Sequence, residues 1–482
     1  MLRYRVLSRS ARPDEATRDE LRKLETALLE ARRQGQTGQA YRALQKAITL
    51  MEGKTWTPAL DFGCSLMLTP AFIVADPVKP LIIQIGQRYP TLAEPGASLS
   101  ARVLLSRTAG GGVGRDLSPA VSLGIFTGFA SDLVFEPFRF AVDLGPAEDG
   151  PYRLLVEVRN GDQVVQRLES PLHLVRDLDA TRKAVLQRLD RIPGFDKVKA
   201  SARYPFDLAH SLNLGRLTVP AYDFSAGLAK SMELLAAIES GKDPFAGNTG
   251  NLARHYYFSE ADEIMPYRVY VPKLYDGSRS CPLIVALHGL GGTESTLLQQ
   301  GGGILGKLAE ERGWLVVAPL GYRRNGGYGR MLAAIADPQT ARMTQLSEKD
   351  VINVLRLVRE EYRVDPCRIY LLGHSMGGNG TWTLGARYAE IWAALAPIAG
   401  GGTNPGDVSL ERLQEQHLPV IVVHGDADRV APVEASRTMV ARLKKLGVNH
   451  EYIEVAGGGH GDVVVPNLPR ILEFFSRHSR TP

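Results

Sequence analysis

Cysteine is scarce in this 482-residue chain, since only Cys64, Cys281 and Cys367 occur, far apart and odd in number. There is no Cys-x-x-Cys pair, so the sequence offers no dithiol or zinc motif. This spacing disfavours a disulfide framework, and we expect three reduced thiols that pack as small apolar side chains. The ten histidines are scattered and form no His-Glu-x-x-His motif. We therefore expect neither a metal nor a cofactor.

Long apolar runs and a strong charge of one sign are also missing. No stretch of about 20 apolar residues exists, which argues against a membrane-spanning helix. The net charge is only +5, from 57 basic and 52 acidic residues, so a nucleic-acid partner is not expected. The first ten residues lack the apolar core of a signal peptide. This favours the cytoplasm, or a secreted or periplasmic protein if a leader has been removed, and the sequence leaves the compartment open.

The chain is too long for one hydrophobic core, because domains typically hold about 100–200 residues. Residues 1–75 show apolar positions at helical spacing and predict a helical region. Residues 76–176 contain short β-rich runs, among them 81–85, 102–105, 134–135, 152–158 and 163–168. With Asn160-Gly161 as a hairpin turn, they predict an accessory β-sandwich of immunoglobulin-like type. Residues 177–250 are expected to form a helical linker or a cover over the active site.

Residues 251–482 alternate apolar strands with helices. A helix is predicted to begin at Ser347, where Ser-x-x-Asp350 is close to a capping box. Nearly continuous apolar strands indicate a mostly parallel sheet that is buried on both faces, and therefore an α/β fold. The predicted strands are 267–271, 283–287, 314–317, 368–372, 393–396, 420–423 and 451–455.

One short motif predicts a nucleophile. Gly373-His-Ser375-Met-Gly377 follows the predicted strand at 368–372 and precedes a helical pattern at 378–388. This strand–turn–helix context is what a Gly-x-Ser-x-Gly motif requires, because the serine must stand on a tight turn with its hydroxyl above the sheet. Side chains two residues to either side would collide, so both positions need glycine. We predict that Ser375 is the nucleophile.

A serine hydroxyl is a weak nucleophile that needs an adjacent base and an acid to orient that base. His460 stands in a glycine-rich loop directly after a late predicted strand, and we predict that it is the general base. An earlier strand leads into His424-Gly-Asp426-Ala-Asp428, where we predict that Asp428 orients the imidazole. Asp426 stays open as the alternative acid. The chain order of serine, aspartate and histidine is that of α/β-hydrolases.

The oxyanion of a tetrahedral intermediate needs two preorganised donors. The backbone N–H of Met376, at the positive end of the following helix, is the first candidate. The second is expected in the loop His288-Gly-Leu290-Gly-Gly292, which follows the strand at 283–287. We assign it to the N–H of Leu290, with Gly289 as the alternative. His288 is expected to brace this loop rather than to act as a second base.

These motifs resemble the carboxylesterase and predicted-peptidase branch of the α/β-hydrolases, over about residues 253–480. This branch is related to feruloyl-esterase and polyhydroxybutyrate-depolymerase-like enzymes and, more distantly, to prolyl oligopeptidases. The resemblance implies ester hydrolysis through an acyl-enzyme, without a metal or cofactor. Some relatives carry an immunoglobulin-like domain ahead of the hydrolase domain, which implies possible homo-oligomerisation or a shaped cleft. The matching stretches are Pro282–Gly289, Val364–Gly378, Asn379–Trp382 and His424–Asp428.

Three aromatic side chains are candidates for the acyl pocket. Tyr322 and Tyr328 lie in a loop after a strand whose end faces the catalytic side, and Trp382 opens the helix after the serine. They predict a preference for small or aromatic esters. The expected function is therefore a serine carboxylesterase, and the substrate is a small-molecule or polymer-linked ester.

Other functions stay open at this stage. A prolyl-oligopeptidase-like peptidase would use the same triad, although no propeller-type repeat precedes the hydrolase region. A polyester or feruloyl esterase is a further alternative. A binding module without catalysis would have no need for the three triad residues. Comparing hydrolysis of esters and peptide amides distinguishes the esterase from the peptidase. Covalent labelling of the serine would exclude the binding module.

Overall fold

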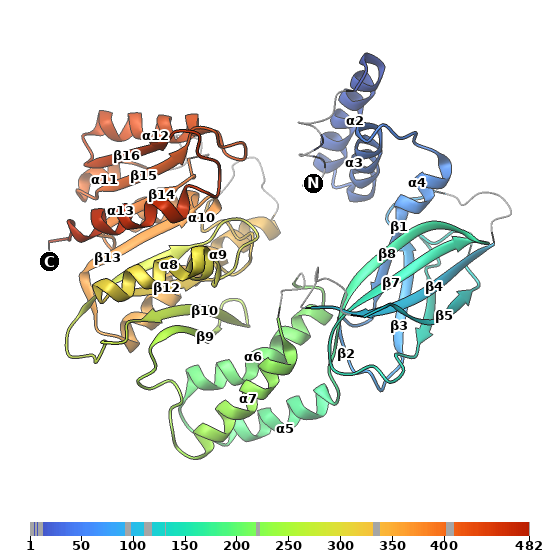
Figure 1. Cartoon of the computed structure of the whole chain (residues 1–482), viewed down its shortest axis with the longest axis horizontal. Helices are drawn as coiled ribbons and strands as arrows, with labels where there is room; N and C mark the ends of the chain where they lie inside the picture. The colour runs from blue at the N-terminus through green and yellow to red at the C-terminus, as the bar shows by residue number, and fades with distance from the viewer. Residues whose placement is uncertain are drawn as a thin grey trace. The chain divides into compact units, whose positions relative to one another are not determined.

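The computed structural model describes residues 4, 7, 13–91, 98–109, 118–130, 132–217, 222–330, 338–401 and 409–481. The chain forms two compact units, with elements labelled as in Figure 1. The first unit holds Met1–Arg191 and Pro205–Glu233, and the second holds Ile192–Tyr204 and Leu234–Pro482. Within the described ranges, no helix combines the length and apolar character that crossing a membrane requires.

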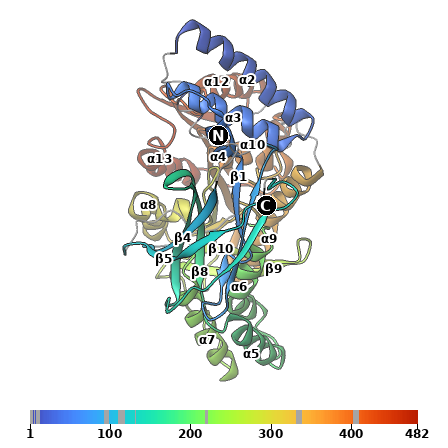
Figure 2. The same cartoon turned by 90° about the vertical axis from the view of Figure 1, so that its right-hand side faces the viewer.

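A helical hairpin opens the first unit, as the apolar spacing predicts. Its two helices, α2 (Glu15–Arg33) and α3 (Thr37–Met51), lie side by side in both views (Figure 1, Figure 2). The side chain of Asp14 caps α2 by accepting the Thr17 N–H at 2.8 Å. Leu28 and Leu44 are buried in the small core between the helices. The short helix α4 (Pro58–Ser65) follows.

Two sheets in the first unit share one hydrophobic core. The strand orders are β1-β3-β6 and β2-β8-β7-β4-β5. Ile83 of β3 and Val156 of β7 are fully buried in the common core, so the sheets form two packed layers. The strands are β1 (Leu66–Pro70), β2 (Val74–Ala75), β3 (Leu81–Gln87), β4 (Leu99–Arg107), β5 (Val121–Thr127), β6 (Phe138–Val142), β7 (Gly150–Asn160) and β8 (Gln163–Leu174).

Some local predictions for this region are wrong. Val134 and Phe135 lie in a turn, because the carboxylate of Asp132 accepts the Val134 N–H at 2.8 Å and closes the chain on itself. In the β7–β8 hairpin, Asn160 pairs with a residue of β8, so the turn is centred on Gly161 and Asp162. Only Gly161 has a positive φ there, at 54°. The immunoglobulin-like topology stays a prediction.

Three further helices connect the sheets to the rest of the chain: α5 (Leu178–Asp190), α6 (Asp196–Asn213) and α7 (Phe224–Glu239). The division between the two compact units passes through α6 and α7. Strands β1 and β2 precede residue 76, where the sequence placed the start of the sandwich. The four-part division of the chain, and a covering role for residues 177–250, stay proposals.

One eight-stranded sheet organises the second unit, in the order β16-β15-β14-β13-β11-β12-β10-β9. Strands β11 to β16 are parallel and β10 is antiparallel to both of its neighbours, which confirms the mostly parallel sheet. The strands are β9 (Gly250–Phe258), β10 (Glu263–Val271), β11 (Cys281–Leu287), β12 (Leu315–Pro319), β13 (Val364–His374), β14 (Ala394–Ile398), β15 (Val420–Gly425) and β16 (His450–Val455).

Helices cover both faces of this sheet. Successive strand residues face opposite cores, as Ile284 and Val285 do in β11. One core contains α8 (Thr296–Arg312) and α13 (Val464–Ser476), which lie on the same side of the sheet in Figure 1. The other contains α9 (Pro338–Glu361), α10 (Met376–Arg387), α11 (Glu411–Glu415) and α12 (Val433–Leu446). This three-layer arrangement gathers the ends of the parallel strands at one edge.

The predicted helix start at Ser347 is wrong. Both Ser347 and Asp350 are fully buried inside α9, where they hold a loop rather than cap a helix. Ser347 Oγ accepts the Tyr328 N–H at 3.0 Å, and the Asp350 carboxylate accepts the Tyr322 N–H at 2.8 Å and the Tyr256 hydroxyl at 2.5 Å. These tertiary bonds fix the loop after β12.

Burial of Asp350 predicts a pH-dependent stability. Burial raises its pKa to about 6, although the hydrogen bonds from Tyr256 and the loop N–H groups oppose this. The carboxyl group of Asp350 thus binds its proton more tightly in the folded than in the unfolded state. The stability that this proton contributes is complete well below pH 4 and is lost as the pH rises through 6. Relative to Asp350→Asn, the unfolding free energy of the wild type should fall by roughly 2 kcal/mol between pH 4 and 7. Urea titrations of both proteins measure this, and a difference independent of pH would contradict it.

Candidate active site

Ser375 occupies the sharp turn between β13 and α10. Its backbone has φ 58° and ψ −112°, a strained conformation for a residue with a side chain. A Cβ on Gly373 would lie 2.2 Å from the carbonyl oxygen of Gly377, and one on Gly377 would lie 2.1 Å from that of Leu287. Only glycine therefore fits on either side of the serine, as predicted. The strand–turn–helix context of the motif is confirmed.

Three side chains from different loops converge at this turn. Nε2 of His460 lies 2.8 Å from Oγ of Ser375, and Nδ1 of His460 lies 2.6 Å from Oδ2 of Asp428. The loops that carry Asp428 and His460 follow β15 and β16, which are adjacent parallel strands. The imidazole can thus accept the serine proton on one nitrogen while the carboxylate holds the other.

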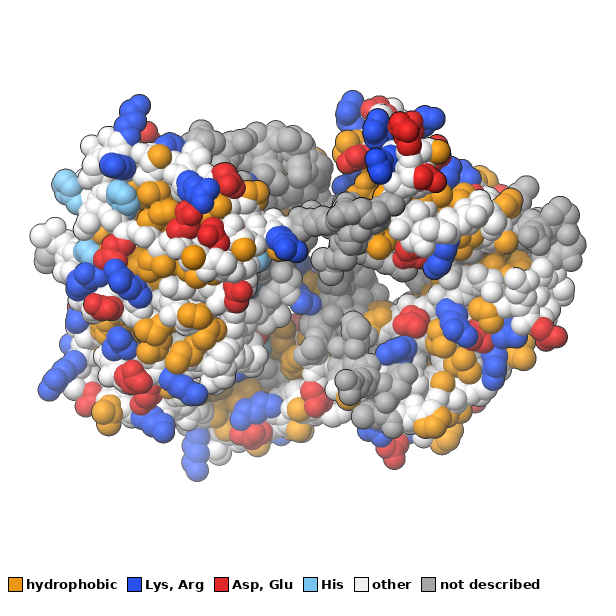
Figure 3. All heavy atoms as spheres, turned by 45° about the horizontal axis from the view of Figure 1, so that its top comes forward, with side chains coloured by type: hydrophobic (Ala, Val, Ile, Leu, Met, Phe, Trp, Pro, Cys, Tyr) orange, Lys and Arg blue, Asp and Glu red, His pale blue; other side chains and the backbone are white. Residues whose placement is uncertain are grey.

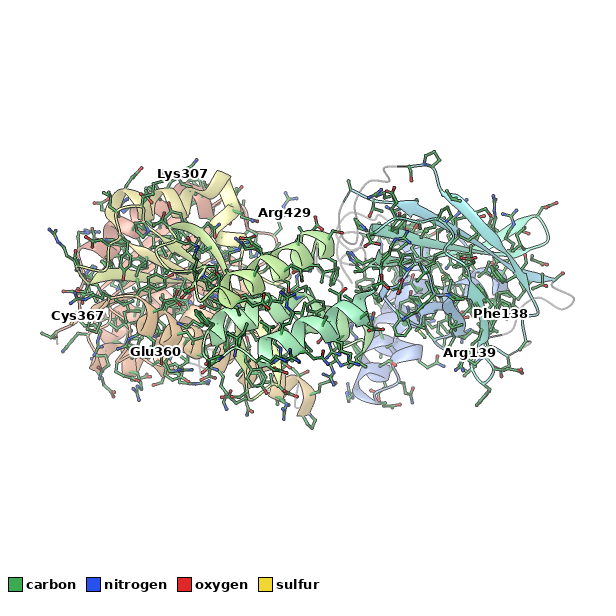
Figure 4. All side chains as sticks on the ribbon, turned by 90° about the horizontal axis from the view of Figure 1, so that it is seen from below. Phe138, Arg139, Lys307, Glu360, Cys367 and Arg429 are labelled. Carbon is green, nitrogen blue, oxygen red and sulfur yellow. The ribbon has the colours of Figure 1, made fainter. Side chains whose placement is uncertain are left out.

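Asp428 combines burial with hydrogen bonds that keep its charge. Its side chain is fully buried, while the next residue, Arg429, is exposed and extends outward from the second unit (Figure 4). Burial acts to raise the pKa of Asp428. Hydrogen bonds from the Ala431 N–H, from His460 and from the Val430 N–H outweigh burial and lower the pKa. The carboxylate is therefore ionised at neutral pH.

Asp426, the alternative acid, holds the backbone instead. Its Oδ1 accepts the Gly457 N–H at 2.7 Å, and its own N–H donates to the carbonyl oxygen of Val455. The Ala427 N–H donates to the carbonyl oxygen of Gly458 at 3.0 Å. These bonds fasten the loop after β15 to the loop that carries His460.

The two segments that carry the oxyanion candidates approach Ser375. Met376 begins α10, and the first N–H groups of a helix have no intrahelical acceptor. A Cβ on Gly289 would lie 3.4 Å from Cβ of Ser375, so the loop after β11 passes directly over the serine. In this loop the N–H groups of Gly291 and Gly292 are already engaged, with the carbonyl oxygens of Arg324 and Gly289. The Leu290 N–H, with Gly289 as the alternative, therefore stays our proposed second donor.

This oxyanion loop, residues 288–292, is braced from two sides. The ring nitrogens of His288 lie 2.7 and 2.8 Å from the carbonyl oxygens of Gly289 and Leu320, and burial lowers the pKa of the imidazole. Nε of Arg324 donates to the carbonyl oxygen of Gly291 at 2.8 Å. These contacts fit the predicted bracing role of His288 and add Arg324, which sequence reasoning missed.

Replacing Arg324 with alanine should lower kcat on the order of tenfold with little change in KM, because a looser loop mispositions one oxyanion donor. Steady-state kinetics on a 4-nitrophenyl ester measure this. Arg429→Ala, which removes an exposed arginine from a neighbouring loop, is the matched control and should behave like the wild type. Equal effects of both substitutions would point to general surface charge instead.

The predicted aromatic pocket is not supported. Tyr328 and Trp382 are fully buried in the hydrophobic core, so they pack rather than line an open site. Nε1 of Trp382 donates to the carbonyl oxygen of Gly400 at 2.8 Å. Tyr322 is half-buried, and its ring stacks under the guanidinium of Arg323 at 3.8 Å. The aromatic rings of Tyr328 and Trp382, which suggested a pocket, pack in the core around α10.

Two histidines next to the motifs also join the site. His374 precedes the serine, and its Nε2 lies 2.7 Å from the carbonyl oxygen of His460. His424 precedes the loop of Asp428 and lies 3.2 Å from that carboxylate. Their only sequence signal is adjacency to the motif residues. Across the described ranges, no cluster of three His, Cys, Asp or Glu side chains is arranged to hold a metal ion.

Comparison with known proteins fits this geometry. Residues 269–464 match the dienelactone hydrolase family. The second unit has the α/β-hydrolase fold. A bifunctional acetylxylan esterase/xylanase from Neocallimastix patriciarum is 31% identical over 162 residues, which are 34% of this chain and 21% of that protein. Cutinase 1 from Thermobifida cellulosilytica is 28% identical over 107 residues, 22% of this chain and 37% of that protein.

The chain thus spans about a fifth to two fifths of the length of these curated relatives. Among solved structures, a thermostable esterase aligns with 86% of this chain and 100% of its own, at 20% identity and a TM-score of 0.40. The α/β-hydrolase assignment rests on the family match and on the observed sheet order.

Proposed function

We propose that the protein is a serine carboxylic-ester hydrolase that works through an acyl-enzyme. The observation that carries this proposal is the hydrogen-bonded series of Ser375, His460 and Asp428 on a strained turn. A serine held in this way has an adjacent base, and the base has a buried carboxylate to orient it. The family match and the esterase names of the curated relatives support the same reaction class.

In the first step, His460 Nε2 takes the hydroxyl proton while Ser375 Oγ forms a bond to the ester carbonyl carbon. The carbonyl electrons move to the oxygen. The N–H groups of Met376 and Leu290 donate hydrogen bonds to this oxygen and stabilise its negative charge. The intermediate collapses as the imidazolium gives its proton to the leaving alkoxide, which leaves an acyl-serine. Water then repeats the sequence, and the acid and free enzyme are released.

Two features bear on the substrate class. The relatives are named for ester-cleaving activities on acetylated xylan and cutin, so small acyl esters and polymer-linked esters are the first candidates. The molecular face in Figure 3 carries basic and acidic side chains interspersed, without a block of one sign. Feruloyl and polyester substrates are subclasses of the same proposal.

An ester and amide panel tests the proposed function. The wild type should hydrolyse 4-nitrophenyl acetate and butyrate with saturation kinetics, while peptide amides of the prolyl-oligopeptidase type should be cleaved far more slowly. Methyl ferulate, acetylated xylan and a polyester film then rank the ester classes. Faster cleavage of the peptide amides would replace the esterase proposal with a peptidase, and no hydrolysis of any ester or amide would contradict both.

A further inference from the structure

A fourth polar side chain reaches the buried carboxylate of the candidate triad. His424 is the penultimate residue of β15, and its side chain is fully buried. Its Nε2 lies 3.2 Å from Oδ2 of Asp428 and 3.1 Å from the carbonyl oxygen of Ala431. Oδ2 of Asp428 is also the atom that contacts His460, so two imidazoles share one carboxylate oxygen.

The neighbours of His424 determine which ring nitrogen carries a proton. Both groups next to Nε2 are acceptors, a carboxylate oxygen and a carbonyl oxygen, so Nε2 must be the donor. Nδ1 lies 2.7 Å from Oγ of Ser436 in α12, and this hydroxyl can donate to it. Ser436 is fully buried as well, which leaves the bond without competition from water. The hydroxyl thus stabilises the tautomer whose Nε2–H donates to the carbonyl oxygen of Ala431, beside Asp428.

Three hydrogen bonds and the contact with His424 surround the carboxylate. Oδ1 of Asp428 accepts the N–H groups of Val430 and Ala431, at 2.7 and 2.9 Å. Oδ2 faces His424 on one side and His460 on the other. The carboxylate thus accepts three hydrogen bonds, and the buried imidazole of His424 lies against the same oxygen that accepts from His460.

We propose that His424, with its ring held by Ser436, is a positioning residue that fixes Asp428 for its work on His460. The inference rests on the proposed function, because it concerns the same triad. His424 touches no reacting atom. It acts through the carboxylate, so its loss should weaken transition-state stabilisation while substrate binding stays intact.

Matched substitutions separate positioning from packing. His424→Leu removes the hydrogen bond to Ala431 and the polar contact with Asp428, and kcat for 4-nitrophenyl acetate should fall on the order of 10-fold because the turn that holds the carboxylate loses a buried hydrogen bond. His424→Gln keeps an N–H group near the position of Nε2 and should recover kcat to within about threefold of the wild type. KM should stay within about twofold in both variants.

Ser436→Ala provides a second, milder test that does not depend on replacing a large buried ring. Without the hydroxyl, Nδ1 of His424 loses its buried partner and the ring is held less firmly, so kcat should fall about 3- to 10-fold. Ser65→Ala is the control, because Ser65 is equally buried and lies in the first unit. It should leave kcat unchanged. If His424→Leu fails to fold, the comparison of the two serine variants decides.

The outcomes distinguish this inference from the proposed function. An active wild type whose kcat is unchanged in His424→Leu, or in Ser436→Ala, overturns the role of His424 and leaves the esterase proposal standing. Equal losses in His424→Leu and His424→Gln show a packing role and also overturn it. A wild type without esterase activity contradicts the proposed function itself.

Discussion

Replacing Ser375 with alanine should lower kcat/KM for 4-nitrophenyl esters by about 10⁴-fold or more. The hydroxyl is the atom that forms the acyl bond, and no other side chain stands at 2.8 Å from His460 Nε2 among the described residues. Folding should be unaffected, because alanine removes one partly exposed oxygen and keeps the backbone. Initial rates with purified protein and a no-enzyme blank measure the loss.

The control for this experiment is Ser65→Ala, which removes a buried hydroxyl from the first unit. It should keep the wild-type rate. Retention of more than a few per cent of the activity in Ser375→Ala would mean that another nucleophile carries the reaction.

Asp428→Asn should lower kcat by about 10⁴-fold although it changes only one atom. The N–H groups of Val430 and Ala431 require an acceptor at the Oδ1 position, so the amide oxygen must lie there. The amide NH₂ then faces His460 Nδ1 and His424 Nε2. It would donate to Nδ1 of His460, which places the imidazole proton on Nε2 and prevents the ring from accepting the serine proton.

Asp426→Asn is the matched control for this prediction. Its amide oxygen can still accept the Gly457 N–H, so the loop stays fastened and the rate should remain within about threefold. Kinetics of the two variants at several pH values give the comparison. A large loss in Asp426→Asn with little loss in Asp428→Asn would reverse the assignment of the acid.

Local sterics made part of the site predictable from the sequence. The motif around Ser375 specifies its own geometry, because the glycines at 373 and 377 are required by contacts under 2.3 Å that any Cβ would make. The loops with Asp428 and His460 were predictable because each directly follows a parallel strand, and such strand ends meet at one edge. These arguments need only chain order and strand direction.

Tertiary packing made the remaining features unpredictable. Tyr328 and Trp382 have the composition of a pocket, but the core around α10 encloses them. Asp350 has the sequence position of a helix-capping residue, yet its carboxylate accepts hydrogen bonds from Tyr322 and Tyr256, which are distant in sequence. Strand β9 escaped prediction because polar residues, such as the buried Arg254 and the half-buried His255, interrupt any apolar run. In each case a long-range partner decides the structure.

Covalent labelling at Ser375 tests the central claim most directly. After incubation with a fluorophosphonate, intact-protein mass spectrometry should show one adduct, and peptide mapping should place it on the peptide that contains Ser375. The Ser375→Ala protein should stay unlabelled, and Asp428→Asn should label far more slowly than the wild type. An adduct on another residue, or none on a folded wild type, would contradict the account.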